Sequence, residues 1–232
     1  MILTPATARA YWRALLDNAT RLIADANLLL AAASIGRARA LTVLAEEELG
    51  KATTVYDTFS RAWSKRSLEG VELAQGSARD HLAKYAAAYE FGRDLDTFWG
   101  DDYPEGPEDD DWARWHAERQ AEARAAAKVA NQEKQRGFYV DLGAGEISTP
   151  AQFDRDRVEE HLVTAAQVIE MMLIRDHSRM KFESPDHYDS THDMQWRVMP
   201  VSHGLDYAAF VESAAEGAGD ADDSSRQGDP AQ

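Results

Sequence analysis

The sequence predicts an all-α fold. Alanine is abundant within segments of helical periodicity, β-branched residues are scattered, and two-residue alternation does not persist beyond a few positions. Strands would require that alternation, whereas alanine-rich periodic segments favour helices. At 232 residues, of which 44% are hydrophobic, the chain can bury one sizeable core. We therefore expect a single bundle of about five main helices over residues 1–181, with little sheet.

Periodicity and terminal signals place each helix in turn. The first helix is expected to start near Thr4, because Pro5 suits the first helical position. Gly50, inside the second helix, costs about 1 kcal/mol relative to alanine, which indicates a tight helix crossing at that point. Gly137 is expected to end the fourth helix, and residues 138–141 are expected to form a short extended piece. The five helices are expected at about residues 4–34, 36–65, 77–99, 112–136 and 149–181.

Three segments are expected to differ from these helices. Residues 100–111 combine Pro, Gly and a block of acidic side chains, which predicts an exposed acidic loop. Residues 182–215 show no consistent period, which predicts an irregular extension with room for a short helix. Residues 216–232 lack apolar content, so we expect a disordered acidic C-terminal tail.

Composition limits the classes of function. A formal net charge of −16 argues against DNA binding and broad nucleic-acid binding, which need a basic surface, but it leaves room for a small local RNA site. The absence of cysteine excludes disulfides and thiolate metal sites. The sequence contains no signal-like N-terminus, and no apolar run approaches the roughly 18 to 20 residues of a membrane span. We expect a soluble cytoplasmic protein without a membrane partner.

Residues 41–52 place charged side chains on or beside the apolar stripe of a helix. At about 100° per residue, Glu48 falls near the middle of this stripe, Lys51 lies at its edge, and Glu47 points well away from it. Burial of an unpaired carboxylate is strongly unfavourable. Glu48 is therefore expected either to form a structural ion pair with Lys51, three positions on, or to face a polar pocket between helices.

Four sequence pieces occur together in a distinctive order. They are Asn18 with Arg21 and Asp25, AEEELGKA at 45–52, HLAK at 81–84 and KQRGFYVD at 134–141. Over about residues 10–180 the chain thereby resembles the AbiV-type abortive-infection family of bacterial phage-defence proteins. That family is similar to the HEPN superfamily of helical bundles, many of which are metal-independent ribonucleases or toxins acting as dimers. The resemblance implies an antiparallel HEPN-like bundle, a homodimer, no cofactor, and an RNA target or a phage protein as trigger.

The resemblance also favours a site at His81 and Lys84, one turn apart on the third helix. If this helix lies beside the second, Glu48, Lys51, His81 and Lys84 could meet as catalytic residues in one pocket. Imidazole could move the proton during 2′-hydroxyl attack on RNA, and ammonium groups could stabilise charge on the phosphate. Candidates for support of this pocket are Asp25, Glu47, Lys134 and Tyr139, although Tyr139 is more simply interpreted as a packing residue.

Two other groups of residues are weaker candidates. The usual HEPN ribonuclease signature, Arg followed after four to six residues by His, fits Arg155 with His161 and Arg197 with His203. Such short spacings recur by chance. The histidines and aspartates of residues 177–193 fit no metal-ligand template, and the acidic loop lacks the alternation of an EF-hand. We therefore predict no metal site.

Three hypotheses about function remain open. The first is an abortive-infection effector that arrests growth or translation in infected cells, with metal-independent RNA cleavage as its candidate activity. The second is a non-catalytic protein-interaction module that binds or is activated by a phage protein, which the net negative charge favours. The third is an unrelated activity on a shared helical scaffold, because fold does not fix function.

Overall fold

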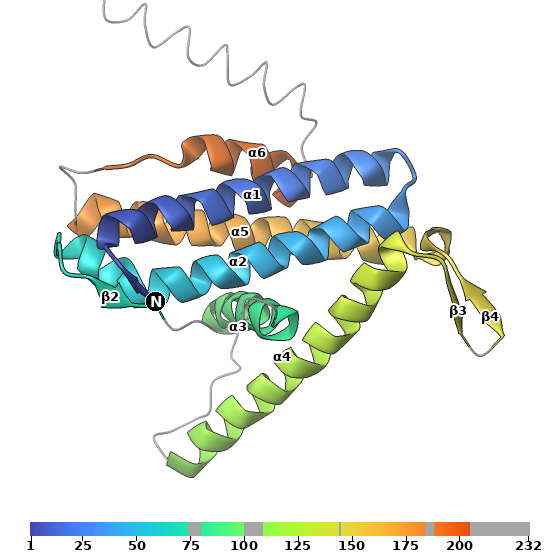
Figure 1. Ribbon diagram of the computed structural model, residues 1–232, viewed down its shortest axis with the longest axis horizontal. Helices are drawn as coiled ribbons and strands as arrows, with labels where there is room; N and C mark the ends of the chain where they lie inside the picture. The colour runs from blue at the N-terminus through green and yellow to red at the C-terminus, as the bar shows by residue number, and fades with distance from the viewer. Residues whose placement is uncertain (74–79, 100–108, 144, 184–187, 205–232) are drawn as a thin grey trace, which may run out of the picture.

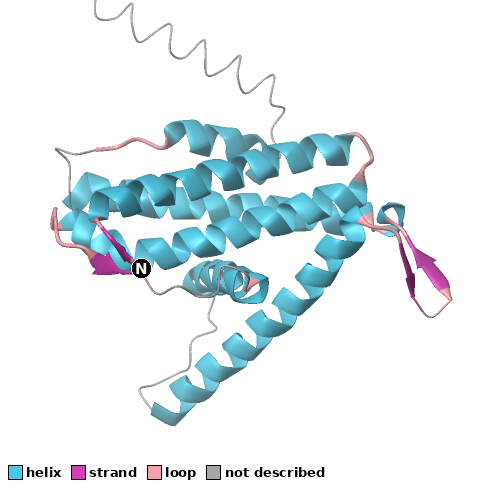
Figure 2. Cartoon of the chain, in the orientation of Figure 1, coloured by secondary structure: helices cyan, strands magenta, loops and turns pink. Residues whose placement is uncertain are grey.

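The computed structural model describes residues 1–73, 80–99, 109–143, 145–183 and 188–204. These residues are predominantly helical, which confirms the predicted all-α class (Figure 2). The helices are α1 (Pro5–Ala31), α2 (Ile35–Ser64), α3 (His81–Trp99), α4 (Asp109–Phe138), the short 3-10 helix η1 (Pro150–Gln152), α5 (Arg155–Glu183) and α6 (His192–Ser202). Two antiparallel strand pairs join β1 (Ile2–Leu3) to β2 (Val71–Glu72) and β3 (Asp141–Gly143) to β4 (Glu146–Ser148).

The central helix of the fold is α2. It contacts α1 and α5 on one side and α3 and α4 on another, while α6 packs on α1 and α5 (Figure 1). The α4 helix crosses α2 obliquely, and its N-terminal end extends away from the bundle. Removal of apolar side chains from water is the main stabilising contribution to such a core. Its largest fully buried side chains include Trp12, Leu16, Phe59, Ile169 and Met172.

The starts of three helices show how local signals act. Thr4 caps α1 as expected, because its hydroxyl oxygen accepts a hydrogen bond at 3.2 Å from the backbone N–H three residues on. The third helix begins at His81 rather than near residue 77, and the Asp80 carboxylate caps it in the same way at 3.0 Å. Thr149 caps η1 instead of the last long helix, which begins at Arg155.

Two glycines allow close contacts between α2 and its neighbours. A Cβ atom on Gly50 would overlap the carbonyl oxygen of Lys84 in α3, which confirms the predicted tight crossing. Gly137 lies in the last turn of α4, close to the predicted end, but the helix continues one residue beyond it to Phe138. A Cβ atom on Gly137 would overlap the carbonyl oxygen of Gly36 in α2. Both α3 and α4 therefore lie closer to α2 than a side chain would allow.

The region after α4 is more regular than the sequence predicts. Residue 138 still belongs to α4, and the β3–β4 hairpin was not predicted, because three-residue strands show too little alternation. Within the expected irregular extension, α6 adds Met194, Val198 and Val201 to the main core. Most of the expected acidic loop (100–108) and all residues from 205 onward, including the expected tail, lie outside the described residues. Within the described ranges, no helix combines the length and apolar character needed to cross a membrane.

Candidate functional site

The candidate site is centred on Glu47, a carboxylate of α2 that is only 5% exposed. Its Oε2 atom lies 2.7 Å from Nδ1 of His81, the first residue of α3. Its Oε1 atom accepts a hydrogen bond from the ammonium group of Lys134, which is buried in α4. Glu47 therefore joins three helices through one buried carboxylate.

His81 is the accessible member of this group. Its side chain is 50% exposed, whereas the side chains of Glu47 and Lys134 are almost fully buried. A carboxylate at Nδ1 selects the tautomer that carries its proton there, which leaves Nε2 as the acceptor. No described residue forms a hydrogen bond with Nε2 of His81. The site therefore presents an oriented proton acceptor at the protein surface.

The glycine contacts explain why these side chains meet. Gly50 follows Glu47 by nearly one helical turn, and Gly137 follows Lys134 by the same interval. Gly50 brings the α3 backbone close to α2 within one turn of Glu47. Gly137 brings the end of α4 close to α2 at Gly36, one turn of α4 beyond Lys134. The cap on α3 then fixes His81 as the first residue of its helix. The geometry of the site thus follows from features that are local in the sequence.

The structure corrects the predicted orientations of Glu47 and Glu48. Periodicity directs Glu47 away from the buried face, yet it is the more buried of the two, and the side chain of Glu48 keeps 21% exposure. A single apolar stripe assumes one buried face, whereas α2 is covered on two sides. Glu48 forms an ion pair with Lys51 within α2, the structural alternative that the sequence left open. His81 therefore contacts Glu47 rather than Glu48.

The other residues expected in the pocket lie around this centre or away from it. Lys84 follows His81 by one turn of α3 and is half-buried. Asp25 is exposed on α1, and Tyr139, which follows the end of α4, is 60% exposed. Asp25 and Tyr139 are thus surface side chains in this structure.

A second charged network lies beside Glu47 and was missed at the sequence level. Arg39 of α2 is buried, donates from Nε to Glu133 of α4 at 2.8 Å, and lies 3.4 Å from Glu46. Burial raises the pKa of Glu46 to about 7, although Arg39 and Tyr85 oppose the shift. Burial, followed by the charge of Glu46, also raises the pKa of Tyr85. The interface between α2, α3 and α4 is therefore strongly polar.

One sequence signal could have revealed this network. Arg39, Val43, Glu46 and Gly50 recur at intervals of four and three residues, which is the spacing of a second helical stripe on α2. In the structure, Val43 packs in a small cluster with alanines of α4. This stripe of charged and small residues follows the helical period as closely as the apolar stripe does. It therefore indicates a second buried face of α2.

The two Arg–His spacings do not bring their members together. Arg155 donates from Nη1 to the carbonyl oxygen of Leu30 at 2.9 Å, at the end of α1. His161 is half-buried, and its pKa is lowered by burial and then by a neighbouring guanidinium group. Arg197 and His203 also have separate partners. Neither spacing therefore forms a pair in this structure.

The histidine-rich region of residues 177–193 is the other weaker candidate from the sequence. Part of it, residues 184–187, lies outside the described residues. His177 is hydrogen-bonded through Nε2 to Thr191 at 2.7 Å, and the ring of His192 lies 4.6 Å from that of His177. Across the described part of the chain, no three His, Asp or Glu side chains are arranged to hold a metal ion.

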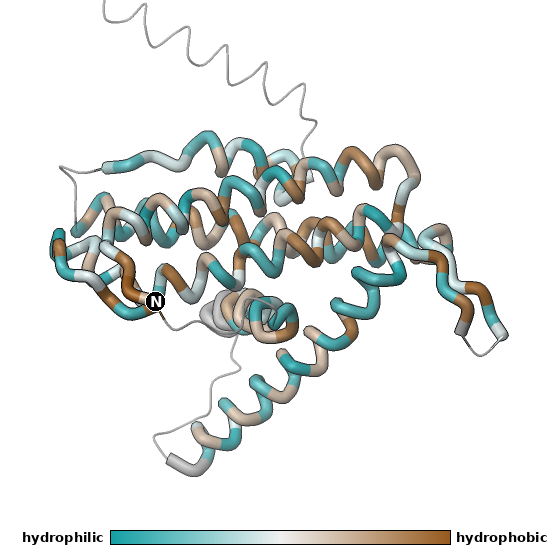
Figure 3. Tube along the Cα trace, in the orientation of Figure 1, coloured by the Kyte–Doolittle hydropathy of each residue, from teal (hydrophilic) through white to brown (hydrophobic). Residues whose placement is uncertain are grey.

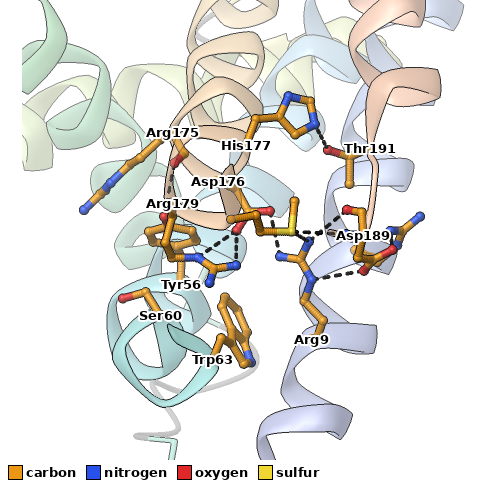
Figure 4. Close-up of polar contacts among 12 residues, drawn as sticks. Arg9, Tyr56, Ser60, Trp63, Arg175, Asp176, His177, Arg179, Asp189 and Thr191 are labelled. Carbon is orange, nitrogen blue, oxygen red and sulfur yellow. Dashed lines mark hydrogen bonds and ion pairs between the residues drawn. The ribbon is translucent and has the colours of Figure 1, made fainter. Parts of the chain in front are cut away.

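Another buried carboxylate, Asp176 of α5, lies close to this region (Figure 4). It forms ion pairs with Arg9 of α1 at 2.8 Å and with Arg179 at 2.9 Å. Arg9 also lies over the ring of Trp12, at 4.5 Å from its centroid, and contacts Asp189 at 3.2 Å. This cluster joins α1, α5 and the segment that leads into α6.

Comparison with known proteins identifies the family. A family model described as AbiV (HEPN_AbiV) matches residues 7–170, a range that includes Glu47, His81 and Lys134 and ends before Asp176. No curated protein and no solved structure is significantly similar to the chain. Because the match covers well over half of the chain, the protein belongs to the AbiV family of HEPN-like abortive-infection proteins, which act in phage defence.

Proposed function

We propose that this AbiV protein acts in the cytoplasm of phage-infected bacteria and arrests growth or translation by cutting RNA without a metal ion. In this proposal it works as a homodimer and a phage product triggers it. The observation that carries the proposal is the half-exposed imidazole of His81, held by the buried carboxylate of Glu47. Imidazole can accept and donate a proton near neutral pH, and an adjacent carboxylate orients it.

In the proposed reaction, Nε2 of His81 removes the proton of a ribose 2′-hydroxyl group, and the freed oxygen attacks the adjacent phosphorus. The P–O5′ bond breaks, which leaves a 2′,3′-cyclic phosphate on one fragment. The leaving O5′ takes a proton from water, and the imidazolium returns its proton to solvent. Glu47 stabilises the imidazolium, and Lys134 balances the charge of the buried carboxylate. Lys84, one turn along α3, is the candidate for stabilising charge on the phosphate.

The test is incubation of purified protein with cellular RNA, with and without lysate from phage-infected cells, followed by detection of 2′,3′-cyclic phosphate ends. His81→Ala should lower cleavage by about 10²- to 10⁴-fold, the usual contribution of general acid–base catalysis, and should remove toxicity in expressing cells. Glu47→Gln should have a smaller effect, because it keeps the imidazole in place. His116→Ala is the matched control, because His116 is an exposed histidine on α4 whose ring lies against Trp115.

The control variant should cleave RNA like the wild type. If His81→Ala keeps full activity and unfolds at the wild-type temperature, the proposed role of His81 is wrong. The comparison with His116→Ala separates a specific effect from the general loss of a surface histidine.

A non-catalytic protein-interaction module is the second candidate, and the β3–β4 hairpin favours it. This hairpin projects from the bundle and carries hydrophobic residues (Figures 1 and 3). Leu142 and Ile147 are cross-strand partners and are 75% and 62% exposed. An exposed apolar hairpin on a chain of net charge −16 suits a protein partner. Toxicity that depends on His81 or Lys51, without RNA cleavage by the wild type and with folded variants, would favour this candidate.

A further inference from the structure

A recess of about 210 Å³ opens where α2, the end of α4, η1 and the start of α5 meet. Its lining is largely charged and includes Arg39, Glu133, Arg136, Phe153, Arg157 and His161. None of the three residues of the Glu47 centre lines it, so the two are separate sites. A water molecule occupies about 30 Å³ in the liquid, so the recess has room for a polyatomic group.

Cationic groups outnumber anionic groups in this recess. Its three guanidinium groups face two carboxylates, those of Glu133 and Asp154. Glu133 is shared between Arg39, at 2.8 Å, and Arg157, at 3.3 Å. One oxygen of Asp154 accepts hydrogen bonds from backbone N–H groups at the start of α5. Arg39 is also paired with Glu46, which does not line the recess. The positive charge open to a ligand is therefore that of the two exposed guanidinium groups, Arg136 and Arg157.

The guanidinium groups at the rim are loosely held. Arg157 is 60% exposed and makes a long contact with Glu133. Arg136 is exposed, donates to Ser148 at 3.3 Å, and lies over the ring of Phe153 at 5.5 Å from its centroid. Each guanidinium group has five N–H donors, so both side chains keep donors for an incoming anion. The buried Arg39 forms a more rigid floor beneath them.

We propose that this recess binds a phosphate group carried by a nucleotide or by an RNA strand. The planar guanidinium groups of Arg157 and Arg136 would hold the phosphate oxygens, because their paired donors match that geometry. The ring of Phe153 would lie beside the attached sugar or base, since aromatic rings provide stacking surfaces for bases. A free nucleotide and an RNA strand offer the same chemical group, and the test separates them.

Binding of inorganic phosphate, adenosine monophosphate and a short single-stranded RNA to the full chain is measured by calorimetry at low salt. Arg157→Gln should weaken the binding of all three probes by about tenfold or more, as expected for loss of a charge-assisted hydrogen bond. Arg155→Gln is the matched control, because Arg155 is exposed on the same helix but bonds the carbonyl oxygen of Leu30. Phe153→Leu should weaken the binding of the nucleotide and the RNA but not of phosphate.

Tighter binding of the nucleotide than of the RNA would identify a nucleotide site, and the reverse order would identify a strand site. The proposal is overturned if no probe binds, or if Arg157→Gln binds as tightly as the wild type. Thermal unfolding shows whether each variant is folded. If Arg157→Gln does not fold, Arg136→Gln on α4 is used instead, and it should weaken the binding of all three probes in the same way. Because the readout is binding, its failure would leave the RNA-cleavage proposal for His81 untouched, and the reverse also holds.

Discussion

Two buried carboxylates of this protein, Glu47 and Asp176, are held by basic side chains in different ways. Glu47 is shared between a buried ammonium group and the half-exposed imidazole of His81. Asp176 is fully buried and is held by two guanidinium groups, from α1 and α5, that lie against tryptophan rings (Figure 4). Both carboxylates are therefore paired, as buried charges must be, but only the first has a partner that reaches the surface.

For a role in proton transfer, the kind of basic partner matters more than the burial of the carboxylate. A guanidinium group stays protonated at any physiological pH, so the Asp176 cluster offers no group that exchanges a proton near neutrality. An imidazole can exchange one. The AbiV match also includes Glu47 and ends before Asp176. We infer that the Asp176 cluster fastens α1 to α5, whereas the Glu47 centre is suited to chemistry.

The largest expected effect comes from removing the charge of each carboxylate in turn. Asp176→Asn should lower the free energy of unfolding by about 3–5 kcal/mol, because two largely buried guanidinium groups lose the anion that they share, although Arg9 keeps another, Asp189. Glu47→Gln should cost somewhat less, about 2–4 kcal/mol, because it leaves one buried cation, Lys134, without its anion, whereas the half-exposed His81 remains hydrated. Urea unfolding of both variants measures the difference. A larger loss for Glu47→Gln would make the Glu47 centre the main structural lock and weaken its assignment to chemistry.

The next effect concerns the contact that positions His81. Gly50→Ala should destabilise the fold by about 1–3 kcal/mol, because its Cβ atom would overlap the α3 backbone, which cannot move as a side chain can. Gly92→Ala within α3 is the control. Its Cβ atom would lie 3.1 Å from a methyl group of Val168, which can shift, and alanine favours the helix. Similar unfolding free energies for the two variants would show that the Glu47 centre does not depend on the close crossing.

Much of the fold could be predicted, because each long helix carries a clear apolar stripe, although α2 also buries a second face. The α1 and α2 helices begin and end close to the expected positions, and Thr4 acts as the expected cap. The β3–β4 hairpin and α6 were harder to predict, because short elements give too few residues for a period to emerge. The core position of Val198 depends on packing against α1 and α5, which only the tertiary structure reveals.

The candidate site was only partly predictable. The resemblance pointed to His81 and Lys134, which do meet at one carboxylate. The choice between Glu47 and Glu48 could not be made from one stripe, because it depends on how many faces of α2 are covered. Arg39 was missed because its closer partner, Glu133, comes from a helix almost 100 residues away in sequence.

The smallest expected effect is a pH dependence next to the Glu47 centre. Burial raises the pKa of Glu46 from its ordinary value of 4.5 to about 7 in the folded protein. The folded state therefore binds this proton more tightly, so the contribution of Glu46 to stability is fully present below about pH 4.5 and is lost as the pH rises through 7.

Relative to Glu46→Gln, the free energy of unfolding of the wild type should fall between pH 5 and pH 8. The fall should be on the order of 1 kcal/mol, less than the full shift implies, because the Glu46 side chain keeps 17% exposure and solvent screens part of the burial cost. Urea unfolding at several pH values measures it, with Glu118→Gln, at an exposed position of α4, as the control. Parallel curves for the wild type and Glu46→Gln would mean that Arg39 keeps the Glu46 carboxylate charged throughout this range. The polar interface of α2 would then resemble the Asp176 cluster, a fixed set of ion pairs without a group that titrates near neutrality.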